Sequence, residues 1–452
     1  MTEVSPRSIA LDCMTEIEGK GRFLQVVLGE ALSKYGWMDF RDRSFLTRLL
    51  HGTLEYMDQT DRILERYSTV RVSKMKPVIR NILRLSACQI LHMDKIPDMA
   101  VCNEAVKLTK KRGLYGLSGF VNGVTRHMAH DREKIKQSIR ESSDMSFRYS
   151  VPDWMVRLLC TESSRETAET VLKTFLEPQK VCIRLNRSFF SSEEAKKEMI
   201  RETEKQAEIT YSPYLDNILY VSGFTSLFDL PLLKSGAAAV QDLSSVLAVI
   251  AADLKEGETV FDVCASPGGK SLEAADIMNG TGDILAMDVS AEKTAAIDGN
   301  IGRSGFKNIR TEVSDACVFR EELSGKADAV LADLPCSGLG MIGSKPDIKM
   351  HVSPDMLISL SVKQKEILNN VCRYVKPGGR MIFSTCTIDP EENEKNRSRF
   401  LDTHGDFEPT DLTGILPHLP HAETLAEGYL QLLPGIHPCD GFFISAFRRK
   451  LS

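Results

Sequence analysis

One stretch, VFDVCASPGGKS at residues 260–271, constrains the fold more than any other part of the chain. Its apolar beginning is typical of a buried strand, Pro267 and the two glycines after it break that strand, and a helical pattern starts near Lys270. A strand, a glycine turn and a helix N-terminus suit a polar ligand, because glycine lets the ligand approach the backbone and free N–H groups point at it. The stretch therefore predicts a cofactor site in an α/β domain.

Strands and helices alternate from this stretch to the end of the chain. Strands are expected at residues 259–264, 283–288, 309–315, 327–333, 380–386 and 441–448, with helical stretches between the first five. The alternation predicts an α/β fold with a doubly wound, mostly parallel sheet, in which ligands bind at the carboxyl ends of the strands. The residues with chemical potential stand at those ends: Cys264, Asp288, Asp315, Asp333 and Cys386, with Cys336 just after.

Two aspartates indicate the kind of cofactor. Asp288 follows the glycine turn by about 20 residues, where an acidic residue suits hydrogen bonds to ribose hydroxyls. Asp315 is placed to reach an adenine amino group. The turn has a proline and two glycines where a dinucleotide motif has GxGxxG, so a nicotinamide-dependent oxidoreductase is disfavoured. The pattern favours a nucleoside ligand such as S-adenosylmethionine.

Two cysteines stand beside this expected cofactor site, Cys336 in ADLPCSG and Cys386 in FSTCT, and an acidic run at 389–394 follows the second. A thiol there can be a nucleophile. One reaction that needs such a nucleophile beside a methyl donor is the methylation of cytosine. Carbon 5 of cytosine is too weakly nucleophilic to take a methyl group unaided, but a thiolate that adds to carbon 6 makes carbon 5 enamine-like. Asp333 could stay protonated, or could hydrogen-bond the ring, to help the addition at the pyrimidine nitrogen. Sequence position alone leaves open which cysteine attacks.

Residues 1–140 have helical periodicity and a basic charge. They hold 24 Lys and Arg against 16 Asp and Glu (+8), while the other residues hold 33 against 46 (−13), which together give −5. A basic module on an acidic body favours a polyanionic partner, although a solvated helical surface would look the same. The basic cluster best placed to touch a phosphate backbone is Lys107, Lys110, Lys111 and Arg112.

We expect three domains: 1–140 is all-helical, 141–235 is a linker and a small α+β module, and 236–452 is the catalytic domain. In the module, strands are expected at 181–186 and 218–221 and a helix at 193–205. We expect Arg184 and Asn186 on the first strand, on a face that meets either RNA or solvent.

Several classes of protein and site are disfavoured. The longest uninterrupted apolar stretch, residues 246–252, is far too short to span a membrane, and the first residues do not look like a signal peptide. The eleven cysteines have no CxxC spacing, so neither a zinc site nor a disulfide framework is predicted. We therefore expect a cytoplasmic protein with free thiols, no bound metal and no membrane partner.

Taken together, the motifs resemble those of the bacterial RNA cytosine-5 methyltransferases of the Sun/Fmu type, and the resemblance covers nearly the whole chain. It rests on DVCASPGGKS from Asp262, the aspartate of AMD at Asp288, ADLPCSG from Ala332 and FSTCT from Phe383. Less specific matches are QDLSS from Gln241, PDIK from Pro346 and GFFISAF from Gly441. The segment 338–345 departs from relatives, which usually carry arginine or histidine before PD.

The resemblance implies a Rossmann-like methyltransferase core, an all-α NusB-like RNA-binding domain at the N-terminus and a small RNA-binding module between them. It implies that Cys386 is the nucleophile, that Cys336 assists product release and that Asp333 is catalytic. It also implies that S-adenosylmethionine is bound by Cys264, Ala265, Ser266, Pro267, Gly268, Gly269, Lys270, Asp288, Asp315 and Asp333. The implied substrate is 16S rRNA, and the implied target is a cytosine like the one numbered 967 in that RNA. The resemblance also implies a monomeric enzyme with no DNA partner.

Two alternatives stay open at this point. The same enzyme could act on transfer RNA or 23S rRNA, and a non-catalytic RNA-binding assembly factor could carry a vestigial core. Intact Cys336, Cys386 and Asp333 speak against the second.

Overall fold

The computed structural model describes residues 5–224 and 226–451. These residues form two compact units. The first, called the helical unit below, contains the described chain up to Glu177 and, in addition, the segment Ile342–His351. The second, called the sheet unit, contains Pro178–Met341 and the chain from Val352 onward. The helical unit is thus completed by a segment from far along the chain.

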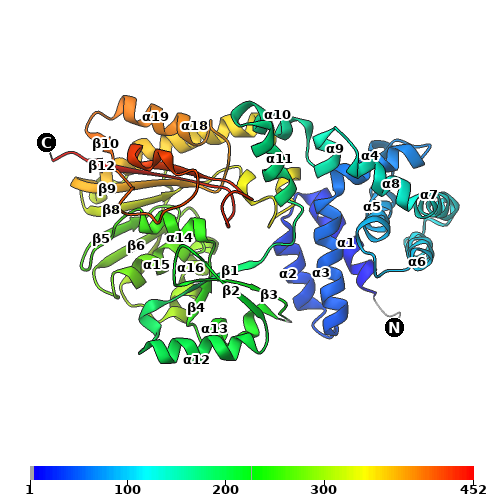
Figure 1. Cartoon of the computed structure of the whole chain (residues 1–452), viewed down its shortest axis with the longest axis horizontal. Coiled ribbons are helices and arrows are strands. Elements are labelled where there is room, and N and C mark those ends of the chain that lie inside the picture. Colours follow the sequence, from blue (N-terminus) through cyan, green and yellow to red (C-terminus); the bar gives the residue numbers. More distant parts are fainter. Residues whose placement is uncertain (1–4, 225, 452) are drawn as a thin grey trace. The chain divides into compact units, whose positions relative to one another are not determined.

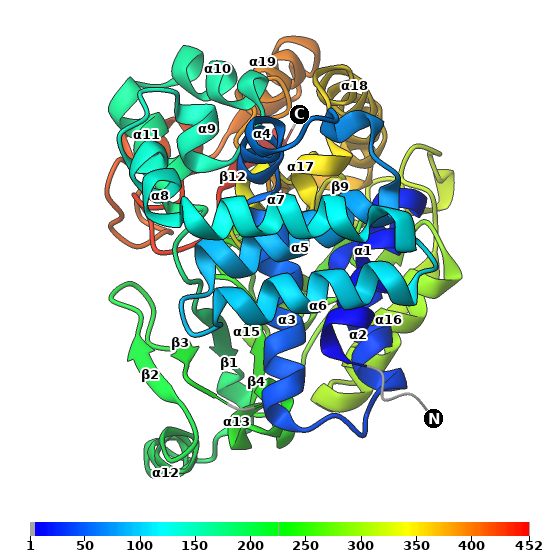
Figure 2. The ribbon, with the colours of Figure 1, turned by 90° about the vertical axis from the view of Figure 1, so that its right-hand side faces the viewer.

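The helical unit confirms the predicted helical N-terminus. Its helices are α1 (Pro6–Lys20), α2 (Leu24–Lys34), α3 (Phe40–Glu55), α4 (Met57–Tyr67), α5 (Pro77–His92), α6 (Asp98–Lys111), α7 (Ser118–His130), α8 (Arg132–Arg140), α9 (Met145–Tyr149), α10 (Asp153–Glu162), α11 (Arg165–Thr174) and α17 (Ile348–His351). Helix α5 begins at a proline and is buried along most of its length, and α6 and α7 pack against it (Figure 2). The apolar stripes read from the sequence therefore form one core.

The segment Ile342–His351 supplies caps for two helices of this unit. The Asp347 carboxylate accepts the backbone N–H of Leu24, the first residue of α2, at 2.8 Å, where the Phe23 side chain gives no cap. The Lys349 ammonium donates to the carbonyl of Glu55, the last residue of α3, at 2.7 Å. A carboxylate at a helix start and an ammonium at a helix end satisfy free backbone groups and complement the helix dipole.

The main sheet of the sheet unit confirms the predicted α/β fold. Its strands are β5 (Thr259–Asp262), β6 (Asp283–Asp288), β7 (Ile309–Val313), β8 (Ala327–Asp333), β9 (Val375–Thr385), β10 (Phe407–Pro409), β11 (Tyr429–Leu432) and β12 (Phe442–Arg449). The order is β10-β12-β9-β8-β5-β6-β7, and β11 pairs with β12. Strands β5, β6, β7, β8 and β9 are parallel to one another, and β12 pairs antiparallel with β9, β10 and β11. The short strands β10 and β11 were not predicted.

Helices cover both faces of this sheet, as the doubly wound arrangement requires (Figure 1). One core contains side chains of α14 (Leu243–Ile250), α15 (Gly269–Ile277) and α16 (Ala291–Ser304). The other contains side chains of α18 (Pro354–Val371) and α19 (Glu394–Thr403). Strands β5, β8 and β9 lie centrally, so their carboxyl ends are flanked on both sides, and the sequence motifs fall at those ends.

The small α+β module is a second sheet of four antiparallel strands in the order β2-β3-β1-β4. Its elements are β1 (Val181–Leu185), α12 (Glu193–Glu204), β2 (Glu208–Tyr211), β3 (Ile218–Ser222), α13 (Pro231–Lys234) and β4 (Ala238–Val240). The expected strands and helix are present, but Arg184 is fully buried and Asn186 nearly so. Arg184 donates to Gln241 at 2.8 Å and pairs with Asp276 of α15 at 3.5 Å. The prediction that the Arg184 side chain faces RNA or solvent is therefore wrong.

Candidate active site

The predicted cofactor turn connects β5 to α15. Strand β5 ends at Asp262, two residues earlier than predicted, and the turn contains a cis Ser266–Pro267 peptide bond. Gly268 has φ +101°, and a Cβ there would lie 3.0 Å from Ile297 Cγ2. Only glycine suits a position with both a left-handed backbone and so close a neighbour. Helix α15 begins at the next residue, so its free N–H groups face the turn.

Asp262 is a buried acid at this turn. It was not among the predicted site residues. Ser271 donates to Asp262 Oδ2 at 2.7 Å, and Oδ1 has no hydrogen-bond partner among the described residues. Burial raises the pKa of Asp262 to about 7. An orphaned buried oxygen needs a partner, so the turn suits a polar ligand with a donor group. The strand-end position was the signal available in the sequence.

Asp288 ends β6 and faces the same turn. Its Oδ2 accepts the N–H of Ser266 at 2.9 Å, and its Oδ1 accepts the N–H of Val289 at 2.8 Å and pairs with Lys293 at 3.0 Å. The carboxylate is buried yet retains lone pairs beyond these bonds. Asp288 can therefore both fix the turn and accept ribose hydroxyls, and its cofactor role stays a prediction.

The structure places Asp315 less favourably. Strand β7 ends at Val313, so Asp315 lies two residues beyond the strand. It is exposed, and its Oδ1 accepts the N–H of Cys317 at 3.0 Å. Ser314 nevertheless donates from its backbone to the Asp288 carbonyl at 2.9 Å, which keeps the segment beside the turn. Contact between Asp315 and an adenine ring stays a prediction.

Lys270 and Asp333 form a charged pair between the turn and the end of β8. Lys270 Nζ lies 2.6 Å from Asp333 Oδ2, and Ser384 Oγ donates to Asp333 Oδ1 at 2.8 Å. Burial alone would lower the pKa of Lys270, but Asp333, with Asp262 and Cys386, raises it overall. Lys270 therefore stays an ammonium and places a cation beside Cys386.

The fold brings together Cys336 and Cys386, the two cysteines whose roles could not be assigned from their positions in the sequence. Cys336 Sγ and Cys386 Sγ lie 3.1 Å apart, and Gly340 donates from its backbone to the Cys386 carbonyl at 3.2 Å. The hydrogen bond with Cys386, burial and the nearby Glu392 raise the pKa of Cys336 well above its ordinary value. An anion thus lies beside Cys336 and a cation beside Cys386. This charge distribution favours the thiol form of Cys336.

The other cysteines near the site lack such surroundings. Burial raises the pKa of the Cys264 thiol strongly, and the neighbouring carboxylates add to this effect. The pKa of Cys317 is raised as well, by burial and by Asp315. All eleven cysteines are free. Cys264 and Cys317 therefore stay thiols, and only the pair Cys336 and Cys386 has the arrangement of a reactive centre.

The basic cluster on the helical unit is partly used for structure. Lys107, Lys110 and Lys111 are exposed. Arg112 is half-buried, pairs with Asp12 at 2.7 Å and donates to the Ser8 carbonyl at 3.3 Å, so it ties α6 to α1. Three of the four predicted phosphate contacts are therefore available to a polyanion.

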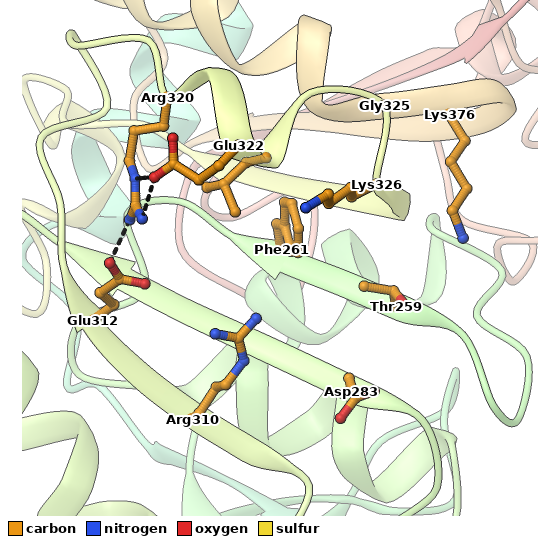
Figure 3. A pocket seen from close by; sticks show the side chains of 11 residues that line it. Thr259, Phe261, Asp283, Arg310, Glu312, Arg320, Glu322, Gly325, Lys326 and Lys376 are labelled. Carbon is orange, nitrogen blue, oxygen red and sulfur yellow. Dashed lines mark hydrogen bonds and ion pairs between the residues drawn. The ribbon is translucent and has the colours of Figure 1, made fainter.

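A separate cavity of about 590 Å³ does not contain the site residues (Figure 3). Its lining includes Thr259 and Asp283, the first residues of β5 and β6, so it opens at the amino ends of the strands. Arg320 there pairs with Glu312 and Glu322. Ligands of parallel sheets bind at the opposite, carboxyl ends.

Within residues 5–224 and 226–451, no group of three or more His, Cys, Asp or Glu side chains is arranged to hold a metal ion. In the same part of the chain, no helix is both long and apolar enough to cross a membrane.

Two known protein families match parts of this chain. Residues 249–448 match the family described as 16S rRNA methyltransferase RsmB/F, and residues 4–130 match the NusB family. The probable ribosomal RNA small subunit methyltransferase B of Bacillus subtilis is 32% identical over 457 residues, which cover 100% of both chains.

Solved structures share the fold. One crystal structure, 25% identical, covers 99% of each chain with a TM-score of 0.80. A methyltransferase homolog protein from Pyrococcus horikoshii, 26% identical, covers 68% of this chain and 98% of its own, with a TM-score of 0.57.

Proposed function

Because this chain belongs to the RsmB/F family of 16S rRNA methyltransferases, we propose that it methylates carbon 5 of a cytosine in 16S rRNA through a covalent adduct on Cys386. The target would be a cytosine like the one numbered 967 in 16S rRNA. The observation that carries the proposal is the pair of sulfur atoms 3.1 Å apart at the ends of neighbouring strands, beside the cofactor turn.

The cofactor is S-adenosylmethionine, which supplies an electrophilic methyl group when bound. The residues of the turn suit it. Asp288 offers carboxylate lone pairs for ribose hydroxyls, the start of α15 offers free N–H groups, and Asp262 Oδ1 offers a buried acceptor. Asp315 is the residue proposed to reach the adenine.

The first step of the proposed reaction belongs to Cys386. Its thiolate adds to carbon 6 of the cytosine, and the electrons of the 5,6 double bond make carbon 5 nucleophilic. The Asp333 carboxylate, already held by Lys270 and Ser384, keeps lone pairs free to accept a hydrogen bond from the ring. Such a bond holds the base in position beside Cys386 for the addition.

The second step releases the product and involves Cys336. Once carbon 5 carries the methyl group, a base removes the carbon 5 proton, and those electrons restore the double bond and break the S–C6 bond. Cys386 then leaves as a thiolate. The Cys336 thiol, whose sulfur lies 3.1 Å away, can donate a hydrogen bond to the departing sulfur. A donor to the leaving atom lowers the barrier of this step.

The helical unit is proposed to bind the RNA. Residues 1–140 carry a net charge of +8 (24 basic and 16 acidic side chains), and Lys107, Lys110 and Lys111 are exposed on α6. Lysines that replace counterions on a phosphate backbone give affinity that falls with salt. Replacement of the three lysines by glutamine should therefore weaken RNA binding and reduce its salt dependence.

The experiment that tests the reaction uses three cysteine variants with 16S rRNA. Cys386→Ala should abolish methylation, and Cys336→Ala should leave an RNA adduct that survives a denaturing gel. Cys317→Ala is the matched control, since this thiol is near the site but outside the sulfur pair, and it should behave like the wild type. An adduct with Cys386→Ala and none with Cys336→Ala would reverse the two roles.

Bisulfite mapping of ribosomal RNA from a deletion strain identifies the target. Loss of one 5-methylcytosine from 16S rRNA is expected. Loss from 23S rRNA or from transfer RNA would change the substrate while keeping the reaction, and no lost methylation would contradict the proposal.

A further inference from the structure

A buried carboxylate lies beneath the turn that carries Cys336. Glu392 belongs to the acidic run at 389–394, between β9 and α19, and is fully buried. Most acidic residues of a run face water, and a buried one needs hydrogen bonds to offset the loss of hydration. What Glu392 bonds to therefore indicates what it does.

Glu392 and one glutamine hold both neighbours of Cys336. Glu392 Oε2 accepts the backbone N–H of Ser337 at 3.0 Å and a hydrogen bond from Gln364 Nε2 at 2.8 Å. The same Gln364 Nε2 donates to the Pro335 carbonyl at 3.0 Å. Gln364, on α18, is itself fully buried. The backbone on each side of Cys336 is thus fixed by Glu392 and Gln364.

The same network reaches the residue after Cys386. Ser337 Oγ and Thr387 Oγ1 lie 2.7 Å apart, and Asn393 Nδ2 donates to the Thr387 carbonyl at 3.0 Å. Glu392 and Asn393 are adjacent, so one short piece of chain holds the segments of both cysteines. The distance of 3.1 Å between the sulfurs depends on these bonds, because neither segment is a regular strand or helix there.

We propose that Glu392 is a positioning residue for product release, which holds the Cys336 thiol against Cys386 through Ser337 and Gln364. The inference rests on the proposed function and adds a residue to it. Glu392 does not touch the substrate in this scheme; it acts through Cys336.

The charge of Glu392 has a second effect. It contributes to the raised pKa of Cys336, so it helps to keep this side chain protonated. A protonated Cys336 can donate to the departing sulfur, whereas a Cys336 thiolate would repel it. Removal of the charge should therefore impair release at high pH first.

The test compares Glu392→Ala, Glu392→Gln and the neighbouring control Glu391→Gln in the full-length enzyme. Glu391 is only half-buried and pairs with Lys395 and Arg399, away from the cysteines. Three quantities are measured with 16S rRNA: the rate of the first turnover, the steady-state rate, and the amount of RNA adduct on a denaturing gel. Binding of S-adenosylmethionine by calorimetry reports whether the site is intact.

Glu392→Ala should lower the steady-state rate by about tenfold to a hundredfold, as small misplacements of reacting groups do. The first turnover and cofactor binding should change far less, and adduct should accumulate. Glu392→Gln keeps an acceptor for Ser337 but loses the charge. This variant should release product at neutral pH, but as the pH rises it should stop releasing product at a lower pH than the wild type does. Glu391→Gln should match the wild type.

Two results would overturn the inference. One is wild-type release and adduct levels in both Glu392 variants. The other is an equal loss of cofactor binding, first turnover and release, which would mean that Glu392 only stabilises the fold. If Glu392→Ala does not fold, the pH dependence of release by Glu392→Gln decides alone. Failure of the wild type to form 5-methylcytosine, or an active Cys386→Ala, would instead contradict the proposed function.

Discussion

The replacement Lys349→Met tests whether the segment Ile342–His351 is part of the helical unit. Lys349 Nζ donates to the Glu55 carbonyl at 2.7 Å and to the Ser150 carbonyl at 2.5 Å, and lies 3.7 Å from Asp58 Oδ2. Its side chain is almost fully buried. Methionine has a similar stem and volume, so the substitution removes the ammonium and leaves no large cavity.

The magnitude follows from the groups left without a partner. An unsatisfied buried acceptor costs about 1–3 kcal/mol, which gives roughly 2–6 kcal/mol for the two carbonyls. Burial of the ammonium opposes this, because burial lowers the pKa of Lys349 and raises that of Asp58, so Asp58 does not fully offset the lost hydration. A net loss of about 3 kcal/mol is expected, within the range for breaking a buried charged pair.

The assay uses a property of the sequence. The chain has two tryptophans, Trp37 and Trp154, and both belong to the helical unit. Tryptophan fluorescence during urea unfolding therefore reports on this unit, and binding of S-adenosylmethionine reports on the sheet unit. For a unit of this size, about 3 kcal/mol corresponds to a fall in Tm of roughly 6–12 °C.

Lys95→Met is the matched control, because Lys95 is exposed in the same unit. Its effect should stay within about 0.5 kcal/mol. A tryptophan transition of Lys349→Met that coincides with the wild type would refute the role given to this lysine. So would a loss of cofactor binding before the tryptophan signal changes.

Three further predictions concern the sheet unit. Arg184→Met should lower its stability by about 1–3 kcal/mol, measured by loss of cofactor binding in urea, since Gln241 would lose a buried donor while Asp276 keeps the N–H groups of Arg187 and Ser188; an unchanged midpoint would contradict this. Asp288→Asn should raise the Kd for S-adenosylmethionine about tenfold by calorimetry, because one charged acceptor is lost; unchanged affinity would exclude the ribose contact. Burial raises the pKa of Asp389 from 3.8 to about 7, so its folded form binds the proton more tightly and stability falls as pH rises between these values. Asp389→Asn should therefore stabilise the enzyme above pH ~7, by at most about 4 kcal/mol, and much less near pH ~4, and an effect independent of pH would refute the assignment.

The fold and the strand-end residues could be predicted because they depend on local patterns. Apolar runs of strand length, glycine turns and helical periodicity repeat often enough to define the alternation, and parallel strands place their carboxyl ends at one edge. Cys336 and Cys386 could thus be assigned to one site. The roles proposed for the two cysteines could not be assigned in this way, because they rest on neighbours such as Glu392, which only the folded chain brings to Cys336.

Other features depend on what covers a residue, which a pattern does not specify. Arg184 alternates with apolar neighbours as a surface residue would, but α15 supplies Asp276 as a buried partner. Asp347 and Lys349 look like ordinary loop residues, and their partners are 323 and 294 residues away. Contacts at such separations have no local signal in the sequence.

The segment Ile342–His351 also has a consequence for synthesis of the chain. The part of the helical unit up to Glu177 is made before the sheet unit, yet the caps of α2 and α3 are in residues that follow much later. Residues 178–351, 174 in number, must be translated after Glu177 before the unit is complete. At about 5–20 residues per second this takes roughly 10–35 seconds, during which the ribosome holds a helical unit whose caps are still missing. The helical unit is therefore completed only after the first segment of the sheet unit, Pro178–Met341, has been translated, and a chaperone that binds nascent chains would meet it in an incomplete form.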